Sequence, residues 1–190
     1  MSTQAVFENL ELKHKVFGTV SGLVRDDCVL ATNTSAIPIE KVAAGIDKPE
    51  RVLGMHYFSP VPSMQLLEII PHAGTNKESM SKAFAVGIKQ GKTCIEVADV
   101  PGFYVNRALA PMMAEVAPLF EDGVTPKQLD EAILDLGMPV GPITLLDEVG
   151  ADVGLHVQHT MLADSTMGSR MAGAKPEMLQ HLVDQNWKGR

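Results

Sequence analysis

Residues 52–71, with the sequence VLGMHYFSPVPSMQLLEIIP, contain two short apolar runs separated by a polar turn. One histidine, His56, lies inside the first run, and one glutamate, Glu68, lies inside the second. Short apolar runs bounded by turn residues are typical of buried β-strands. We therefore expect two antiparallel strands around the turn at residues 58–63, with His56 and Glu68 nearly opposite each other.

Placing two ionisable side chains in apolar strands has a chemical consequence. A buried histidine is costly to charge and a buried carboxylate is costly to leave alone, so a hydrogen bond between them is the cheapest arrangement. A carboxylate on one ring nitrogen of His56 would fix its tautomer and leave the other nitrogen as a base near neutral pH. Such a pair is half of a proton-abstracting site. The alternative is a core histidine that is satisfied by any nearby carbonyl.

The composition is that of a globular chain with an acidic balance. Of the 190 residues, 45% are hydrophobic and 21% are charged. No run approaches the roughly 18 apolar residues that would span a membrane. A net charge of -7 without a basic stripe argues against nucleic acid as a partner. The two cysteines, Cys28 and Cys94, lack metal-ligand spacing, so we interpret them as reduced core residues, with a disulfide as the less favoured alternative.

Helices and strands are expected to alternate through the first hundred residues. Asn9 can cap an amphipathic helix, in which Phe17 belongs to the apolar face and Lys13 lies outside it. Further elements are a strand end at residues 5–7, strands at 28–31 and 93–98, a helix at 38–44, and a helix from a capping box at 75–78 to Gly91. This alternation predicts a layered α/β sheet, with the polar loop at residues 32–35 at its ligand-binding carboxyl edge.

The pattern changes at residues 99–102, beyond which no strand is expected. A helix at residues 103–120 should bend or restart at Pro111 and Pro118. Further helices are predicted at residues 125–137, 141–153 and 176–187, and the Gly- and Met-rich stretch at 165–175 is predicted to be a mobile loop. The sequence therefore predicts two domains: residues 1–100, which are α/β, and residues 101–190, which are all-α.

The usual opening of a dinucleotide-binding domain is not found in this sequence. Such a domain begins with a strand, a G-x-G-x-x-G turn and a helix, followed by an acidic residue for the ribose. The glycines Gly18 and Gly22 lie inside a predicted helix instead. We therefore expect a partial Rossmann-type, doubly wound domain without its first βαβ unit, followed by a helical domain. We interpret the chain as a piece of a longer protein that is truncated at both ends.

Five separated motifs, taken together, resemble the L-3-hydroxyacyl-CoA dehydrogenase family. They are NTS at residues 33–35, HYFSP at 56–60, Glu68, PGFYVNR at 101–107 and GMPVGP at 137–142. The likeness covers essentially the whole chain and is greatest to the dehydrogenase portion of the mitochondrial trifunctional protein α-subunit. It implies NAD-dependent oxidation of (3S)-hydroxyacyl-CoA to 3-oxoacyl-CoA in fatty-acid β-oxidation, and a mitochondrial location.

The resemblance also implies roles for the matching residues. His56 would take the proton from the 3-hydroxyl while C3 gives its hydride to NAD+, and Glu68 would orient His56. Ser35 would hydrogen-bond the reacting oxygen, and Asn106 would lie near the substrate carbonyl. The positions implied for the cofactor are Glu8, Lys13, Asn33 and Ser59, the last of which is Asn in some family members. Because the Gly-rich turn is missing, we expect this chain alone to bind NAD weakly and to turn over little.

Several alternatives remain open. Ser35 could serve only as a cap of the following helix, and Asn106 could be a capping or surface amide. His156 and His159 are spaced for metal binding on a helix, but no carboxylate or cysteine completes a set, so no metal is expected. The whole chain could instead be a non-catalytic module for acyl-CoA docking, assembly or dimerisation.

Expected partners are therefore 3-hydroxyacyl-CoA and further copies of the chain or other β-oxidation subunits. Any membrane association would run only through the parent complex.

Overall fold

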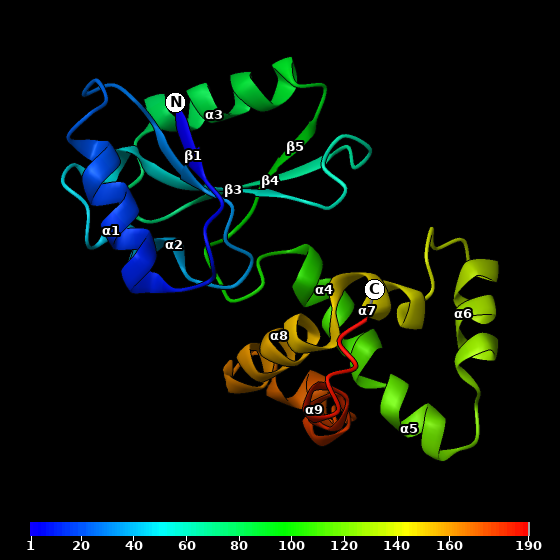
Figure 1. The fold of residues 1–190 in the computed structure, drawn as a ribbon. Helices are drawn as coiled ribbons and strands as arrows, with labels where there is room; N and C mark the ends of the chain where they lie inside the picture. The colour runs from blue at the N-terminus through cyan, green and yellow to red at the C-terminus, as the bar shows by residue number, and fades with distance from the viewer. Residues whose placement is uncertain (190) are drawn as a thin grey trace. The chain divides into compact units, whose positions relative to one another are not determined.

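The computed structural model describes residues 1–189, which fall into two compact units, one spanning Met1–Tyr104 and one beginning at Val105. The first unit is a sheet with helices, and residues 105–189 contain helices and no strand (Figure 1). This is the predicted fold class, α/β followed by all-α, which is therefore confirmed. The sequence places the boundary at residues 99–102, whereas the first unit extends to Tyr104, because the Phe103 side chain packs into its core.

The sheet of the first unit has five strands that lie in their chain order. They are β1 (Ser2–Gln4), β2 (Leu30–Thr32), β3 (Val52–Tyr57), β4 (Leu66–Pro71) and β5 (Thr93–Glu96). The first three strands are parallel, β4 is antiparallel to β3, and β5 is parallel to β4. The run β1 to β3, joined by crossover helices, is the arrangement of a Rossmann-type domain. The strand end predicted at residues 5–7 is wrong, because β1 ends at Gln4 and Phe7 is exposed.

Helices cover both faces of this sheet. The helices are α1 (Leu10–Ser21), α2 (Ile39–Ala43) and α3 (Lys77–Lys89), with a short 3-10 helix, η1 (Pro49–Arg51). Side chains alternate between the two faces of a strand, so Val52 packs in the core with α1 and α2, whereas Leu53 packs in a second core with α3. Figure 1 shows α3 on the opposite side of the strands from α1 and α2.

The starts of α1 and α3 can be compared with the helix caps predicted from the sequence. The Asn9 side chain accepts a hydrogen bond from the Leu12 N–H (2.9 Å), which confirms the predicted start of α1. The capping box predicted from Thr75 is wrong, because the cap of α3 is Asn76. The Thr75 hydroxyl instead donates to the Val52 carbonyl (2.9 Å), so it belongs to the end of the sheet rather than to the helix.

The second unit contains six α-helices within the described residues. They are α4 (Val105–Ala114), α5 (Val116–Glu121), α6 (Pro126–Asp135), α7 (Pro142–Val149), α8 (Ala151–Ala163) and α9 (Pro176–Asp184). The predicted restart is found near Pro118, because the chain leaves the helix at Glu115 and α5 begins at Val116. The restart predicted at Pro111 is wrong, because Pro111 lies inside α4. No helix of the described residues is long and apolar enough to cross a membrane.

The stretch at residues 165–175 is not the open loop that its glycines suggested. It contains a 3-10 helix, η2 (Gly168–Met171), and both Met167 and Met171 are buried. These side chains pack with Met161 and with the small residues Ala110 and Ala114 to form the core of the second unit. The prediction was wrong because flexible methionine side chains fill irregular core space as readily as they occupy loops.

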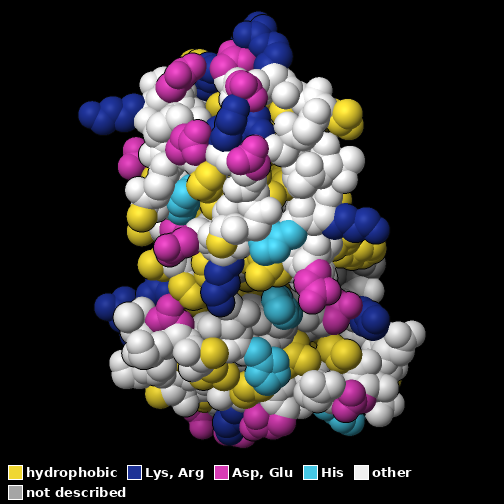
Figure 2. Space-filling model, turned by 90° about the vertical axis from the view of Figure 1, so that its left-hand side faces the viewer, with side chains coloured by type: hydrophobic (Ala, Val, Ile, Leu, Met, Phe, Trp, Pro, Cys, Tyr) yellow, Lys and Arg dark blue, Asp and Glu magenta, His cyan; other side chains and the backbone are white. Residues whose placement is uncertain are grey.

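The surface of the first unit carries both signs of charge side by side. On the face shown in Figure 2, Lys and Arg side chains lie among Asp and Glu side chains. Asp27, for example, pairs with both Arg25 (2.9 Å) and Lys82 (3.4 Å). Such exposed pairs contribute little to stability, typically about 0–1 kcal/mol, so the fold rests on its two apolar cores.

Candidate active site

His56 and Glu68 face each other across the hairpin of β3 and β4. They are direct partners in the antiparallel register, and His56 Nδ1 lies 2.7 Å from Glu68 Oε2. The predicted strand pairing and the hydrogen bond are therefore confirmed. Residues directly opposite on antiparallel strands have Cβ atoms roughly 4.5–5.5 Å apart, which is close enough for a His–Glu side-chain bond without backbone distortion.

The pair is enclosed. The His56 side chain is 8% exposed and the Glu68 side chain 0% exposed, and the rings of Phe58 and Phe103 lie 4.6 Å and 5.7 Å from the imidazole centre. The second carboxylate oxygen, Glu68 Oε1, accepts the Tyr104 N–H (3.0 Å). With Nδ1 donating to the carboxylate, the His56 Nε2 atom carries a lone pair. It has no hydrogen-bond partner within residues 1–189, so it is available to accept a proton.

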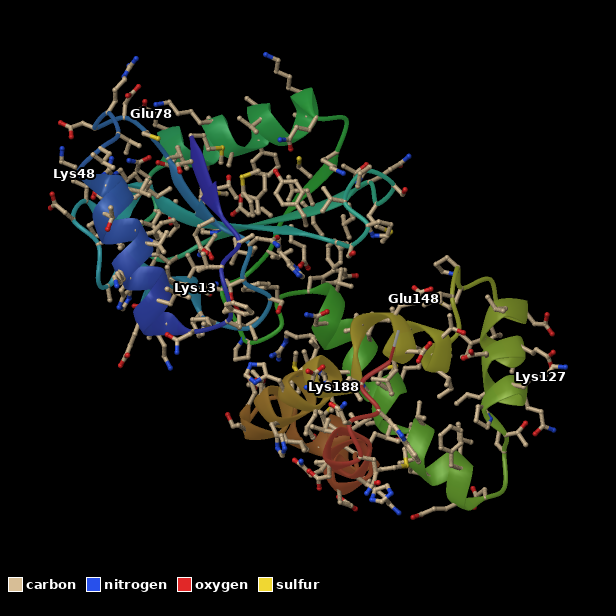
Figure 3. All side chains as sticks on the ribbon, in the orientation of Figure 1. Lys13, Lys48, Glu78, Lys127, Glu148 and Lys188 are labelled. Carbon is tan, nitrogen blue, oxygen red and sulfur yellow. The ribbon has the colours of Figure 1, made fainter. Side chains whose placement is uncertain are left out.

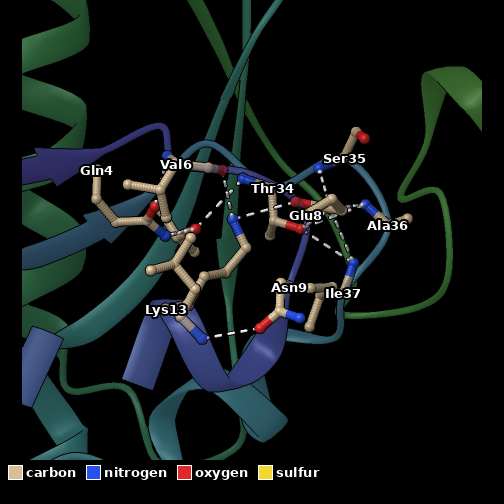
Figure 4. Close-up of polar contacts among 11 residues, drawn as sticks. Gln4, Val6, Glu8, Asn9, Lys13, Thr34, Ser35, Ala36 and Ile37 are labelled. Carbon is tan, nitrogen blue, oxygen red and sulfur yellow. Dashed lines mark hydrogen bonds and ion pairs between the residues drawn. The ribbon is translucent and has the colours of Figure 1, made fainter. Parts of the chain in front are cut away.

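The loop that follows β2 lies beside β3. Asn33 Oδ1 accepts the Tyr57 N–H (2.8 Å), and Tyr57 directly follows His56, so this bond ties the loop to the histidine strand. The Ser35 backbone N–H donates to Glu8 Oε1 (3.2 Å), and the Ser35 side chain is directed away from Glu8 (Figure 4). Within the described chain the Ser35 hydroxyl has no hydrogen-bond partner. Ser35 also does not cap α2, whose N-cap is Pro38, so that alternative is excluded.

Glu8 organises the Ser35 loop. Its Oε1 atom accepts the Thr34 hydroxyl and the backbone N–H groups of Ser35 (3.2 Å), Ala36 (3.2 Å) and Ile37 (3.4 Å). These donors converge on one carboxylate oxygen (Figure 4). A carboxylate that accepts several N–H bonds holds a loop in one conformation, because each bond would otherwise go to water. The orientation of Ser35 thus depends on Glu8.

Lys13 completes this cluster from α1. Its Nζ atom lies 3.1 Å from Glu8 Oε2 and donates to the Val6 carbonyl (3.3 Å), and the residue is only 1% exposed. Lys127 on α6, by contrast, projects into solvent (Figure 3). The sequence-based placement of Lys13 outside the buried face is wrong, because its ammonium finds both a carboxylate and a carbonyl inside. Burial acts to raise the pKa of Glu8, but the Thr34 hydroxyl and the Lys13 ammonium outweigh it and lower the pKa.

The remaining predicted site residues are less closely connected. Ser59 is exposed in the turn after β3. Asn106 lies in the first turn of α4, in the second unit, and is half-buried. Their roles, like those of the other site residues, stay predictions. Within residues 1–189 no group of three or more His, Cys, Asp or Glu side chains is placed to hold a metal ion.

An open α/β sheet with a carboxylate-oriented histidine near its carboxyl edge places a candidate general base where such sheets bind dinucleotides. Residues 1–100 match the family profile "3-hydroxyacyl-CoA dehydrogenase, NAD binding domain", and residues 102–190 match "3-hydroxyacyl-CoA dehydrogenase, C-terminal domain". The chain belongs to the 3-hydroxyacyl-CoA dehydrogenase family, which confirms the resemblance seen in the sequence.

Relatives and solved structures agree with this assignment. The chain is 45% identical over 187 residues to the fatty acid oxidation complex subunit alpha of Vibrio campbellii, covering 98% of this chain and 26% of that protein. The crystal structure of FadB2 from M. tuberculosis has a TM-score of 0.91 at 32% identity, and covers 99% of this chain and 66% of that one. The crystal structure of (S)-3-hydroxybutyryl-CoA dehydrogenase PaaH1 from Ralstonia eutropha has a TM-score of 0.87 at 34% identity, and it also covers 99% of this chain and 66% of that one.

One prediction must be corrected. The similar α-subunits come from bacteria, among them Vibrio, Idiomarina and Shewanella species, so the predicted mitochondrial location is wrong. The error arose because the motifs that carried the resemblance surround the reacting groups. Bacterial and mitochondrial members share that chemistry, and such motifs hold no information on the compartment.

The site residues fit the nicotinamide end of NAD. Two polar atoms without described partners, His56 Nε2 and Ser35 Oγ, belong to residues at the carboxyl ends of the adjacent parallel strands β2 and β3, where open sheets bind dinucleotides. The Gly-rich turn that holds a pyrophosphate does not occur in the sequence. These residues would therefore hold the reacting end of the cofactor and not its phosphates.

Proposed function

We propose that this chain carries the proton-transfer site of an NAD-dependent L-3-hydroxyacyl-CoA dehydrogenase that acts in fatty-acid β-oxidation. The observation that carries the proposal is the 2.7 Å bond between His56 Nδ1 and Glu68, which leaves Nε2 as a proton acceptor. The family assignment supplies the substrate class. On this proposal the parent protein oxidises the 3-hydroxyl of a (3S)-hydroxyacyl-CoA to a ketone.

The protein side of the reaction follows from the site. His56 Nε2 takes the proton of the substrate 3-hydroxyl, and the Ser35 hydroxyl donates a hydrogen bond to the same oxygen. Bound NAD+ supplies the hydride acceptor. Glu68 stabilises the imidazolium that forms, because its carboxylate accepts the Nδ1–H hydrogen bond and offsets the new positive charge. Asn106 is assigned to the thioester carbonyl by family likeness. General-base catalysis of this kind contributes roughly 10²–10⁴ in rate.

The test uses the cofactor segment that this chain lacks. The chain is joined behind a Gly-rich strand, turn and helix of the kind that opens dinucleotide-binding domains, and NADH formation from 3-hydroxybutyryl-CoA is followed by absorbance. We expect activity in the fusion and little in the chain alone. A chain that by itself titrates NADH tightly and stoichiometrically contradicts the expectation of a missing phosphate site.

Two variants of the fusion separate the base from its orienting group. His56→Gln removes the base and is expected to lower kcat by about 10³-fold. In Glu68→Gln, the amide oxygen keeps the Tyr104 N–H and the amide NH2 faces His56 Nδ1, so the ring proton moves to Nε2 and the base is blocked. A loss of about 10²-fold or more is expected. His159→Gln, an exposed histidine on α8, is the control, and a loss there equal to that of His56→Gln would refute the assignment.

We also propose that the parent protein assembles with other β-oxidation subunits or with further copies of itself. The support is that similar proteins are named subunits of a fatty acid oxidation complex. A purely non-catalytic assembly module is the second candidate, and large apolar side chains exposed on the second unit, such as Leu136 and Trp187, favour it. Sedimentation together with the activity assay separates the dehydrogenase from the non-catalytic assembly module. A fusion that dimerises but is inactive fits only the assembly module.

A further inference from the structure

The segment of residues 99–104, here called the strap, connects the end of β5 to the His–Glu pair. Its far end holds the pair from two sides, because the Tyr104 N–H donates to Glu68 Oε1 (3.0 Å) and the Phe103 ring lies 5.7 Å from the imidazole. Phe103 is 2% exposed and belongs to the core shared by α1 and α2. The conformation of the strap therefore affects where Glu68 and His56 lie.

The strap backbone is unusual where it turns toward the pair. Gly102 and Phe103 both have positive φ values, 74° and 51°. A bulky residue such as phenylalanine rarely adopts the left-handed region, and it does so only where surrounding contacts hold it there. The buried ring of Phe103 is one such contact. The near end of the strap, which follows β5, also has side-chain contacts that fix it.

Asp99 holds the near end. Its carboxylate accepts the N–H groups of Ile39 (2.7 Å) and Glu40 (2.8 Å), the first two residues of α2. The N-cap residue of α2, Pro38, has no side-chain cap bond, so Asp99 supplies the cap from a distant part of the chain. The loop that carries Ser35 leads directly into this helix. Asp99 thus connects the Ser35 loop to the strap that holds Glu68.

We propose that Asp99 is a positioning residue that holds the Ser35 loop and the His56–Glu68 pair in one geometry. The effect of Asp99 on the reaction rests on the proposed function, whereas its effect on the His56–Glu68 bond does not. If Asp99 only caps α2, its removal destabilises that helix and leaves the His–Glu bond unchanged. If Asp99 is a positioning residue, its removal loosens the His–Glu bond, because the strap loses one of the contacts that fix the end opposite Tyr104.

Asp130 offers a matched control. Its carboxylate accepts the N–H groups of Ile143 (2.8 Å) and Thr144 (3.1 Å) at the start of α7, and also the Thr144 hydroxyl (2.7 Å), so it is also a carboxylate cap supplied from outside the helix. No strap leads from Asp130 to the His–Glu pair. Asp99→Ala and Asp130→Ala therefore remove the same kind of interaction, and only the first lies on the path to the site.

The first measurement needs no activity. In the nitrogen-15-labelled chain, the proton on His56 Nδ1 is recorded by NMR and its exchange with water is timed. We expect Asp99→Ala to speed this exchange by about tenfold or more and Asp130→Ala to leave it unchanged. Asp99→Asn keeps one acceptor oxygen and should fall between them. If Asp99→Ala does not fold, the comparison of Asp99→Asn with Asp130→Asn decides the question.

The second measurement is made in the active fusion. Asp99→Ala should lower kcat by about tenfold with little change in the KM for NAD, because misplacement affects the reacting geometry more than ground-state binding. Equal losses of melting temperature in the Asp99 and Asp130 variants, with no change in exchange or kcat, would overturn the proposal. If His56→Gln leaves activity intact, the proposed function fails, while the exchange measurement still decides the role of Asp99.

Discussion

At the scale of single residues, Lys13 and Glu8 show how a charge is kept inside the first unit. The ammonium is almost fully buried, whereas the Glu8 side chain is 27% exposed and reaches from the surface to the Ser35 loop. An isolated buried charge would be strongly unfavourable, so Lys13 requires its carboxylate. Burial of Lys13 costs the hydration of its ammonium. In return, the ion pair with Glu8 helps to fix the Ser35 loop beside the proposed base.

The pH dependence of this contribution follows from the direction of the pKa shift. The pKa of Glu8 is below its ordinary value of 4.5 in the folded state: burial raises it, but the Thr34 hydrogen bond and the Lys13 charge outweigh burial. A depressed folded pKa gives stability that is complete above the unfolded pKa and is lost as the pH falls through the folded pKa. Glu8→Gln should therefore cost about 2 kcal/mol at pH 7, less than the roughly 3–5 kcal/mol of a fully buried pair, and the difference should shrink below about pH 4.5.

The measurement is urea unfolding of the wild type and variants between about pH 7 and pH 3. Glu78→Gln is the control, because Glu78 forms an exposed ion pair with Lys82 on α3 (2.7 Å), and water and salt screen such a pair, so its loss should change stability little. Adding Lys13→Met to Glu8→Gln should recover part of the loss, since the double variant has no buried charge to satisfy. A pH-independent effect of Glu8→Gln would contradict the electrostatic account.

The sequence predicts some of these residues and not others for a physical reason. His56 and Glu68 lie twelve residues apart in one hairpin, so the strand period and a short turn were enough to place them opposite each other. Glu8 and Asp99 meet partners from distant segments. The partners of Lys13 are Glu8 and Val6, which are near in sequence but lie in irregular chain before α1, where no periodic pattern places their side chains. Nothing local to Asp99 shows that it will cap α2, because that bond exists only after β5 returns to the sheet.

At the scale of elements, the packing of α3 on the sheet depends on small residues. Ser79, Ala83 and Gly87 are the buried residues of this helix, and Ala83 lies in the core with Leu67 and Ile69. A Cβ atom added at Gly87 would lie 2.8 Å from Leu67 Cδ2 and closer still to Cys94 Sγ. The helix can approach β4 and β5 this closely only because position 87 has no side chain.

Gly87→Ala is therefore expected to destabilise the chain by about 2 kcal/mol, although alanine is the better helix former. Gly18→Ala on α1 is the matched control, because a Cβ there meets nothing within 4 Å. That variant should gain about 0.5–1 kcal/mol from helix propensity alone. Urea unfolding of both variants measures the difference, and a gain in both would show that α3 can shift away from the sheet at no cost. Adding Cys94→Ala should restore part of the Gly87→Ala loss.

Element types were predictable where a local signal decided them. Asn9, with a helical pattern after it, was enough to start α1, and the capping box at Thr125 and Gln128 forms where Thr125-Pro126 opens α6. The cap of α3 was misplaced by one residue because Thr75 and Asn76 are both good caps in sequence. Only the tertiary bond from Thr75 to the Val52 carbonyl decides between them.

At the scale of the whole molecule, each unit has its own core. The two clusters that flank the sheet draw only on residues of the first unit, with Phe103 as their last member, and the methionine-rich cluster draws only on the second. The partners of the His–Glu pair named above, Phe58, Phe103 and Tyr104, also belong to the first unit. These named contacts of the proposed base therefore lie within the first unit.

Residues 1–104 expressed alone should fold and keep the pair. We expect their amide NMR signals, and the Nδ1 proton of His56, to match those of the whole chain. A version that stops at residue 102 is the control, because it lacks the buried Phe103 ring and the Tyr104 N–H. Loss of a buried phenylalanine costs about 3–5 kcal/mol, so this version should unfold at lower urea and lose the Nδ1 signal. Equal stability of the two versions would show that the strap does not hold the pair and would place the support of Glu68 elsewhere in the sheet.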